Sequence, residues 1–200
     1  MVSAVVLAAG QSRRMGRKKE LLTVEGTPMI RTVVEKLLGS SRVDEVIVVL
    51  GEDADGVGAA LSGIIDERIE LVGNRRFAEG MGTSLAQGVS ACSWGTDAII
   101  VAHGDSPFFR TEDVDRIIDA HVRGAAIAVP VSGGRRGHPV LIDGSFHDEL
   151  EDLDGDAGAR DILERERARV VEVELDDEGF LVDIDTPEDY EAVKDGIAGT

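Results

Sequence analysis

"SAVVLAAGQSRRMGRKKELL" (residues 3–22) joins an apolar run to a glycine and then to a cluster of basic side chains. The apolar run is typical of a buried strand, which Gly10 ends. Five cations follow within seven positions, namely Arg13, Arg14, Arg17, Lys18 and Lys19. Open α/β sheets bind ligands where their strands end, and anions bind where backbone N–H groups and cationic side chains converge. The stretch therefore predicts an anion site directly after the first strand.

The basic cluster stands out because the chain as a whole is strongly acidic. Its 200 residues include 39 aspartates and glutamates against 21 lysines and arginines, which gives a formal net charge of −18. Such a surface repels the phosphates of nucleic acid, so we expect no nucleic-acid partner. A run of charges is often an ordinary solvated face. The position of the basic cluster, directly after an expected strand and a glycine, favours an anion site instead.

Length and composition predict one globular domain over residues 1–200. No stretch reaches the roughly 20 apolar residues that span a bilayer, so no membrane partner is expected. The basic cluster follows the apolar run, which is the reverse of the order in a signal peptide. Cys92, the one cysteine, gives neither an internal disulfide nor a set of metal ligands. We therefore expect a cytoplasmic protein.

Apolar runs alternate with segments of helical spacing along the chain. Strands are expected at residues 2–7, 45–51, 68–72, 97–103, 125–131, 138–142, 169–175 and 180–184. Helices are expected from Thr27-Pro28, at 54–65, 82–92 and 111–122, near 159–168, and after Pro187. Apolar strands that alternate with helices are typical of a parallel sheet covered on both faces, and the closer strands of the second half make it mixed. The predicted fold is a single three-layer α/β/α, Rossmann-like domain with a mostly parallel, mixed sheet.

The loop after the first strand is suited to a polyphosphate. Ala8, Ala9 and Gly10 are small enough to let phosphates approach the backbone. Arg14 can clamp two phosphate oxygens with its planar fork, and Lys19 can act as a point charge. The loop lacks both the G-x-x-x-x-G-K-[ST] and the G-x-G-x-x-G patterns, so it is neither a P-loop nor a dinucleotide fingerprint.

"LAAGQSRRMGRKKELL" (7–22) resembles L-A-A-G-x-S-x-R-M-G-x-x-K-x-L-L, the signature of the nucleotidyltransferases that build on molybdenum cofactor. Lys19 occupies the signature lysine. The pair Ala8-Ala9 resembles the cytidylyltransferase branch, because the guanylyltransferase branch typically has L-A-G-G. Later segments extend the resemblance in the family's order over nearly the whole chain: NRRFAEGMGTSLAQG (74–88), HGDSPF (103–108), GRRGHPVLI (134–142), GDAGAR (155–160) and DIDTPEDY (183–190).

The resemblance implies a role for each matching residue. The residues that it assigns to the nucleotide are Leu7, Ala8, Ala9, Gly10, Arg14, Lys19, Asn74, Gly80, Met81 and Ser84. Those that it assigns to catalysis are Arg14, Lys19 and Asp105. The candidates on the acceptor side are His138 and Arg160, with Arg135, Arg136 and Arg160 available for a second anion. Residues 1–110 would mainly bind the nucleotide, and residues 111–200 would bind the acceptor and complete the metal site.

Two carboxylates are candidate metal ligands. Asp105 follows an apolar strand, and Mg²⁺ is usually held by one or two carboxylates together with substrate phosphates. The alternative is an aspartate that caps the following turn. Asp183 and Asp185 alternate along an expected strand, although Asp185 or Thr186 could instead cap the helix that follows. The resemblance favours Asp105 and Asp185 as the ligands of Mg²⁺, with Mn²⁺ as an alternative ion.

The four histidines form no catalytic pattern with the other residues. His103, at a strand end beside Asp105, is expected to pack structurally, and His138 is expected either to face the acceptor or to be structural. His121 and His147 resemble ordinary helix or loop residues.

The resemblance implies transfer of CMP from CTP to molybdopterin cofactor, with release of pyrophosphate and a possible handover to an apo-molybdenum hydroxylase. Ser106 stands where this family often has methionine, so another acceptor, such as a sugar phosphate or polyol phosphate, stays open. GTP stays open as the nucleotide. A carrier that binds finished cofactor without catalysis, or a nucleotide-sensing regulatory domain, would use the same anion loop.

Overall fold

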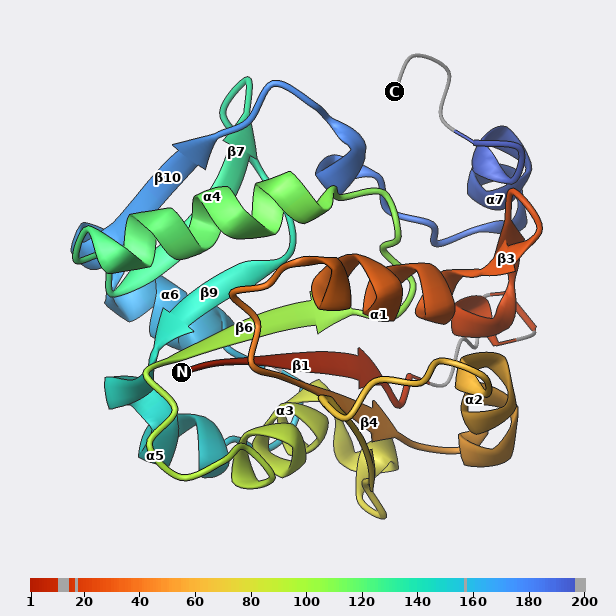
Figure 1. Cartoon of the computed structure of the whole chain (residues 1–200), viewed down its shortest axis with the longest axis horizontal. Coiled ribbons are helices and arrows are strands. Elements are labelled where there is room, and N and C mark those ends of the chain that lie inside the picture. The colour runs from red at the N-terminus through yellow and green to blue at the C-terminus, as the bar shows by residue number, and fades with distance from the viewer. Residues whose placement is uncertain (11–14, 17, 157, 197–200) are drawn as a thin grey trace.

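A mixed sheet forms the centre of the molecule (Figure 1). The computed structural model describes residues 1–10, 15–16, 18–156 and 158–196. The strands lie in the order β10-β7-β9-β6-β1-β4-β5, with β8 paired to β7. Their bounds are β1 (Val2–Ala8), β4 (Glu45–Leu50), β5 (Ile69–Gly73), β6 (Ala98–His103), β7 (Ile127–Ser132), β8 (Arg135–Arg136), β9 (Val140–Asp143) and β10 (Val170–Glu174). A separate hairpin pairs β2 (Thr23–Val24) with β3 (Thr27–Pro28).

Most neighbouring strands in the sheet are parallel. β1 lies between β4 and β6 and is parallel to both, and β5 continues the parallel order beyond β4. β9 is antiparallel to both β6 and β7, whereas β10 is parallel to β7. The predicted mostly parallel, mixed sheet is therefore confirmed. Its carboxyl edge at β1 and β6 is the place where open α/β sheets bind ligands.

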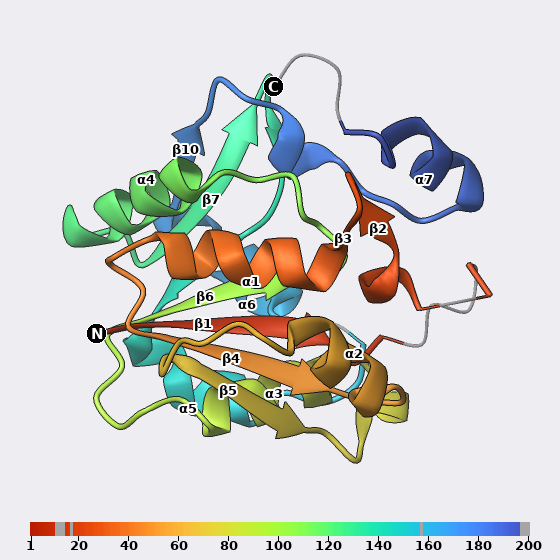
Figure 2. The ribbon, with the colours of Figure 1, turned by 45° about the vertical axis from the view of Figure 1, so that its right-hand side comes forward.

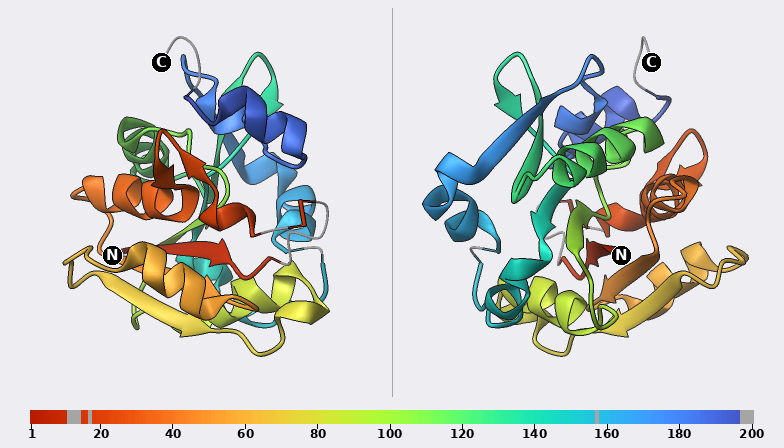
Figure 3. Two further views of the ribbon diagram at one scale, coloured as in Figure 1. Left: turned by 90° about the vertical axis from the view of Figure 1, so that its right-hand side faces the viewer. Right: turned by 60° about the vertical axis from the view of Figure 1, so that its left-hand side comes forward.

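Helices cover both faces of the sheet, which confirms the three layers (Figures 1 and 3). Their bounds are α1 (Met29–Gly39), α2 (Ala54–Leu61), α3 (Met81–Ser90), α4 (Thr111–Val122), α5 (His147–Glu151), α6 (Arg160–Arg165) and α7 (Pro187–Val193). Apolar side chains of α1, α2 and α4 pack with Val6 and Ala8, whereas those of α3, α5 and α6 pack with Val5 and Leu7. This alternation along β1 is what a strand buried on both faces requires. Among the described helices, none is long and apolar enough to cross a membrane.

A smaller apolar cluster attaches α7 to the β2–β3 hairpin (Figure 2). Its buried members are Met15, Leu22, Val24, Met29 and Ile184. Hydrogen bonds reinforce it, because the Tyr190 hydroxyl donates to the Thr23 carbonyl (2.9 Å) and the Glu25 N–H donates to the Lys194 carbonyl (2.8 Å). The last described helix therefore lies beside the β2–β3 hairpin.

Two expected elements are wrong in detail. Residues 180–184 form no strand: Gly179–Leu181 is a 3₁₀ helix, and the sheet position beside β7 belongs to β10. The Phe180 carbonyl instead accepts from the His138 N–H (3.4 Å), so it is not available to a strand partner. The second error is at Thr27-Pro28, which closes the hairpin, so α1 begins one residue later at Met29.

Candidate active site

The carboxyl ends of β1 and β6 bring the first loop and Asp105 to one place. Leu7 pairs with His103 across the two strands, and the Gly104 N–H donates to the Leu7 carbonyl (3.0 Å). Gly104 permits this approach, because a Cβ there would lie 3.2 Å from the Leu7 carbonyl oxygen and 2.9 Å from the Ile30 side chain. Asp105 is the next residue, so its carboxylate lies at the strand end beside the loop.

Lys19 joins two of the candidate carboxylates. Its ammonium lies 2.8 Å from Asp105 Oδ2 and 3.0 Å from Asp185 Oδ1, and it donates to the Ile184 carbonyl at 2.9 Å. The Lys19 side chain is only 14% exposed. Burial lowers the pKa of Lys19, but the charges and hydrogen bonds of Asp105 and Asp185 outweigh it and raise the pKa above its usual value. The lysine is therefore a fixed positive charge between two carboxylates.

The start of α7 directs the Asp185 side chain toward Lys19. Thr186 caps the helix, since its hydroxyl accepts from the Asp189 N–H (3.2 Å) while the Asp189 carboxylate accepts from the Thr186 N–H (2.8 Å). The Asp185 N–H also donates to Asp189 (3.1 Å). Thr186, rather than Asp185, is therefore the capping side chain. The Asp183 side chain reaches solvent, but the chain around it displaces part of the water near its carboxylate, and this desolvation, followed by the neighbouring Asp185 charge, raises its pKa.

The donor set fits a divalent cation. Two carboxylates converge on one position, and Lys19 now places a compact cation there. Mg²⁺ takes oxygen ligands and is usually held by one or two carboxylates together with substrate phosphates. Another group of potential ligands, His147, Asp148 and Glu151, lies on α5 at the opposite end of the sheet (Figure 1). Its two acidic side chains are exposed, so Asp105 and Asp185 are the better candidates.

A cavity of about 360 Å³ opens beside Asp105. The predicted nucleotide and catalytic residues that line it are Leu7, Ala9, Gly10, Gly80, Met81, Ser84 and Asp105. Ala8 lies in the core instead, although its backbone leads into the loop. Arg14 lies outside the described residues. Most of the predicted nucleotide set therefore borders one hollow at the carboxyl edge of the sheet.

Gly80 brings two distant motifs into direct backbone contact. Its φ is +133°, a conformation that side chains disfavour, and a Cβ would lie 2.7 Å from the Asp156 nitrogen and closer still to the Gly155 carbonyl. The Gly82 N–H also donates to the Gly155 carbonyl (2.7 Å). The 74–88 and 155–160 motifs thus pack together and form a shared wall of the site.

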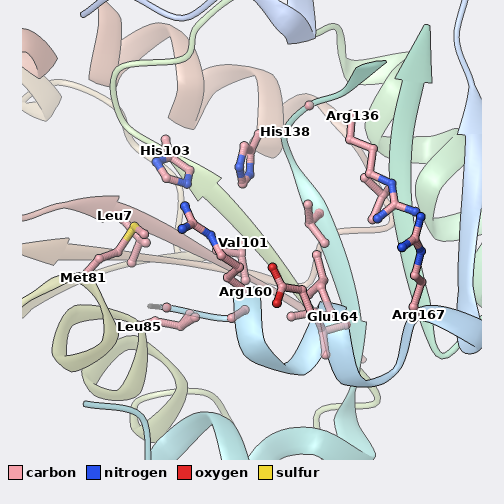
Figure 4. A pocket seen from close by; sticks show the side chains of 17 residues that line it. Leu7, Met81, Leu85, Val101, His103, Arg136, His138, Arg160, Glu164 and Arg167 are labelled. Carbon is pink, nitrogen blue, oxygen red and sulfur yellow. The ribbon is translucent and has the colours of Figure 1, made fainter. Parts of the chain in front are cut away.

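A second cavity, of about 600 Å³, adjoins the first. Leu7, Met81 and His103 line both, so they mark the junction between the two. The predicted acceptor residues His138 and Arg160 line the second cavity. Figure 4 shows the Arg160 guanidinium near His103 and His138, which places a cation beside the junction.

The two histidine rings lie together at this junction, with centroids 4.2 Å apart. Burial lowers the pKa of His103. Burial, and then the neighbouring His103, lower the pKa of His138 to about 3. His138 Nδ1 is buried and has no hydrogen-bond partner within the described ranges. The rings are therefore neutral at pH 7, and the arginines supply the positive charge of the cavity.

Residues 4–170, most of the chain, match the family described as MobA-like NTP transferase domain. The chain belongs to this family. Nicotine blue oxidoreductase of Paenarthrobacter nicotinovorans is 32% identical over 94% of this chain and 93% of its own length. Molybdenum cofactor cytidylyltransferase of Escherichia coli is 26% identical, with 97% and 96% covered.

Solved structures agree with the fold of this NTP transferase. The crystal structure of Rv0371c from Mycobacterium tuberculosis aligns with a TM-score of 0.80 and 28% identity over 95% of both chains. A structure of the same protein in complex with manganese aligns with a TM-score of 0.76 and 26% identity, with 95% and 96% covered. Rv0371c, which shares this fold and is 26% identical to the chain, thus binds a divalent cation, manganese.

Three predicted nucleotide residues within the described ranges, Asn74, Ala8 and Lys19, line neither cavity, and Asn74 is the one that supports the nucleotide side from within. It is buried, and its amide donates to the Thr83 hydroxyl (3.0 Å) and the Ser84 hydroxyl (3.0 Å). Its side-chain oxygen accepts from the Arg76 N–H (2.8 Å). Asn74 therefore holds the start of α3 and orients Ser84, which lines the nucleotide-side cavity.

The sequence interpretation missed two charged residues of the larger cavity, Glu164 and Arg167. Both follow Arg160 at helical spacing, four and seven residues later. That spacing was the signal available in the sequence. Charged residues at the same spacing, however, are equally typical of a helical face that is turned to solvent. Only the structure shows that α6 and the 3₁₀ turn Arg167–Arg169 bring these two side chains to a cavity.

Proposed function

We propose that this NTP transferase moves a cytidylyl group from CTP to molybdopterin cofactor and releases pyrophosphate. The observation that carries the proposal is the convergence of Asp105 and Asp185 on the Lys19 ammonium, at 2.8 and 3.0 Å, beside two adjoining cavities. One cavity would take the nucleotide and the other the acceptor. The junction between them is where the two substrates would meet.

The choice of substrates is supported by sequence. The E. coli molybdenum cofactor cytidylyltransferase is similar to this chain over nearly all of its length. The pair Ala8-Ala9 agrees with the cytidylyltransferase branch of the resemblance. The separation into a nucleotide side and an acceptor side is supported by the cavities. The residues that line the smaller cavity lie between positions 7 and 105, apart from Asp156, whereas most residues that line only the larger cavity lie between positions 129 and 167.

The reaction needs positioning and charge more than proton transfer. An oxygen of the acceptor phosphate attacks the α-phosphorus of CTP, and the bond from that phosphorus to the pyrophosphate oxygen breaks, so pyrophosphate leaves with the electron pair. A phosphate monoester is largely ionised at pH 7, since its second pKa is about 6, so no general base is required. Arg160 would hold the attacking phosphate at the junction.

On the nucleotide side, the chain supplies carboxylates and cations. Asp105 and Asp185 would hold Mg²⁺, or Mn²⁺, which when bound offsets the negative charge of the phosphates. Lys19 is a largely buried point charge beside both carboxylates and would then bind the departing pyrophosphate. Gly10 would let the phosphates approach the backbone, and Arg14 would clamp them.

The test is pyrophosphate release by the purified chain with Mg²⁺, in separate reactions with CTP, GTP, ATP and UTP, with and without molybdenum-loaded molybdopterin. We expect release only with CTP and cofactor together. Asp185→Asn should abolish it, and the matched variant Asp183→Asn, changed at an exposed carboxylate two residues away, should retain most of it. Release with GTP would make the enzyme a guanylyltransferase, and release with a sugar or polyol phosphate would change the acceptor.

If folded protein that still binds cofactor released no pyrophosphate with any nucleotide, this would support a non-catalytic carrier and overturn the proposal. We further propose that the enzyme acts in the cytoplasm and hands its product to an apo-molybdenum hydroxylase. Retention of such a hydroxylase on immobilised, cofactor-loaded chain would test the handover, with unloaded chain as the control.

A further inference from the structure

The segment 160–169 carries charges on two sides, and the two sides differ in how they are neutralised. On the side away from the cavity, Arg165 donates to Glu149 of α5 (2.8 Å) and to Glu166 (3.1 Å). Arg169 donates to the other oxygen of Glu166 (3.1 Å). These outward charges form a closed network of ion pairs.

On the cavity side, the charges have no such partners. Arg160, Glu164 and Arg167 line the larger cavity at helical spacing. Across the described ranges, no hydrogen bond or ion pair involves the side chain of any of the three. The chain carries 39 acidic residues against 21 basic ones, so acidic partners for arginine are plentiful. Two unpaired guanidinium groups that face a cavity in such a chain indicate an anionic ligand.

The two arginines lie at different ends of the cavity (Figure 4). Arg160 extends toward His103 and the junction, whereas Arg167 lies on the far side with Arg136. Glu164 lies between these ends. The order across the cavity is therefore a cation, a carboxylate and a second pair of cations.

Apolar side chains form the floor between the charged ends. They are Leu85, Val101, Val129, Val140, Ile142 and Leu163. A floor of this kind binds a ring or another apolar body, and a cavity of about 600 Å³ lies in the range of small-molecule sites. A ligand that matches the cavity thus has an apolar or ring-like body with polar ends.

We propose that Arg167, together with Arg136, forms a second anion subsite at the end of the acceptor cavity away from Asp105. The ligand it takes is an acceptor with two anionic groups on opposite ends of a ring-like body. One group is held by Arg160 at the junction, and the other by Arg167 and Arg136. The identification of the ligand as the acceptor, and of its first group as the reacting phosphate, rests on the proposed function; the subsite itself does not.

The neighbouring charges define the ligand class further. Arg136 also pairs with Glu172 (2.8 Å), so Arg167 is the cation whose charge is fully available to the ligand. Arg135, the adjacent candidate for a second anion, pairs with Glu178 (3.0 Å) and does not line the cavity. Glu164 repels a continuous polyanion such as a second triphosphate, and it favours N–H donors on the ring between the two anionic ends.

The test uses rigid planar probes with one or two anionic ends, naphthalene-2-sulfonate and naphthalene-2,6-disulfonate, titrated calorimetrically at a fixed salt concentration. We expect the disulfonate to bind wild-type protein at least about tenfold more tightly, since a charge-assisted hydrogen bond contributes roughly that factor or more. Arg167→Gln should reduce disulfonate affinity to that of the monosulfonate and leave monosulfonate binding unchanged. Arg167→Lys should be intermediate, because it keeps the charge and loses the planar fork.

The matched control is Arg169→Gln, which removes the same charge two residues away on the paired side. It should leave both affinities unchanged. Equal losses in Arg167→Gln and Arg169→Gln, or equal wild-type affinity for the two probes, would overturn the subsite. Because the titration contains neither nucleotide nor cofactor, its outcome is independent of pyrophosphate release: the subsite can stand where the cytidylyltransferase proposal fails, and the reverse.

Discussion

Replacing Lys19 by methionine tests the central cluster, because it removes the ammonium and keeps most of the stem. Among the groups that the structure describes, three polar bonds are lost, at 2.8, 3.0 and 2.9 Å, and the charge that separates Asp105 from Asp185 is removed. A hydrogen bond to a charged group contributes about 1.5–3 kcal/mol, but partial exposure of the carboxylates (19% and 32%) reduces this by solvent screening. We expect a loss of about 2–3 kcal/mol in the free energy of unfolding.

For a chain of this length, 1 kcal/mol corresponds to about 2–4 °C in Tm, so the expected decrease is roughly 5–10 °C by calorimetry. The matched control is Lys18→Met, since Lys18 bonds only to the Gly10 carbonyl among the groups described, and it should change Tm little. Added Mn²⁺ should raise the Tm of Lys19→Met more than that of the wild type, because the ion replaces the missing charge between the carboxylates. Equal Tm values for the two variants, with no larger effect of Mn²⁺ on Lys19→Met, would refute the reasoning.

Three further predictions follow from the same structure. Asp185→Asn should lower the affinity for Mn²⁺ at least about tenfold by isothermal titration, whereas Asp183→Asn should change it less, because only Asp185 faces the shared position. Gly80→Ala should cost about 3 kcal/mol in chemical denaturation, since its φ of +133° and its close backbone neighbours both oppose a side chain, and Gly58→Ala, with open space around it, should cost nothing. Burial holds the pKa of His138 at about 3, against 6.5 when unfolded, so the unfolded chain alone binds this proton between those values. Stability should therefore fall by up to about 1.4 kcal/mol for each pH unit below 6.5, and His138→Asn should flatten that part of the pH profile; parallel profiles would contradict it.

The architecture was predictable because local patterns agree with it. Residues 46–50 and 98–102 are apolar throughout, as strands buried on both faces require, and the helical spacing of 111–122 matches α4 at both ends. The false strand at 180–184 shows the limit of such patterns. Its residues have strand-like composition, but β10 occupies the sheet edge that a strand there would need.

The site was predictable where chemistry and position coincide along the chain. Asp105 follows an apolar strand directly, and the Gly10 loop follows another, so parallel neighbours had to bring them together. The contact between Lys19 and both carboxylates spans more than 160 residues to Asp185 and depends on how α7 packs on the hairpin. No local pattern carries that information. The role of Asn74 was likewise visible only in the structure, where its buried amide donates hydrogen bonds to the Thr83 and Ser84 hydroxyls.

The most direct test of the account follows the α-phosphate itself. The purified chain is incubated with Mg²⁺ and molybdenum-loaded molybdopterin, in parallel with CTP labelled at the α- or the γ-phosphate, and with Asp105→Asn as the control. The account predicts that the α-label moves to the cofactor and the γ-label leaves in pyrophosphate, and that neither occurs with the variant. Transfer of the γ-label to the cofactor, or cofactor that binds and acquires no label, would contradict it.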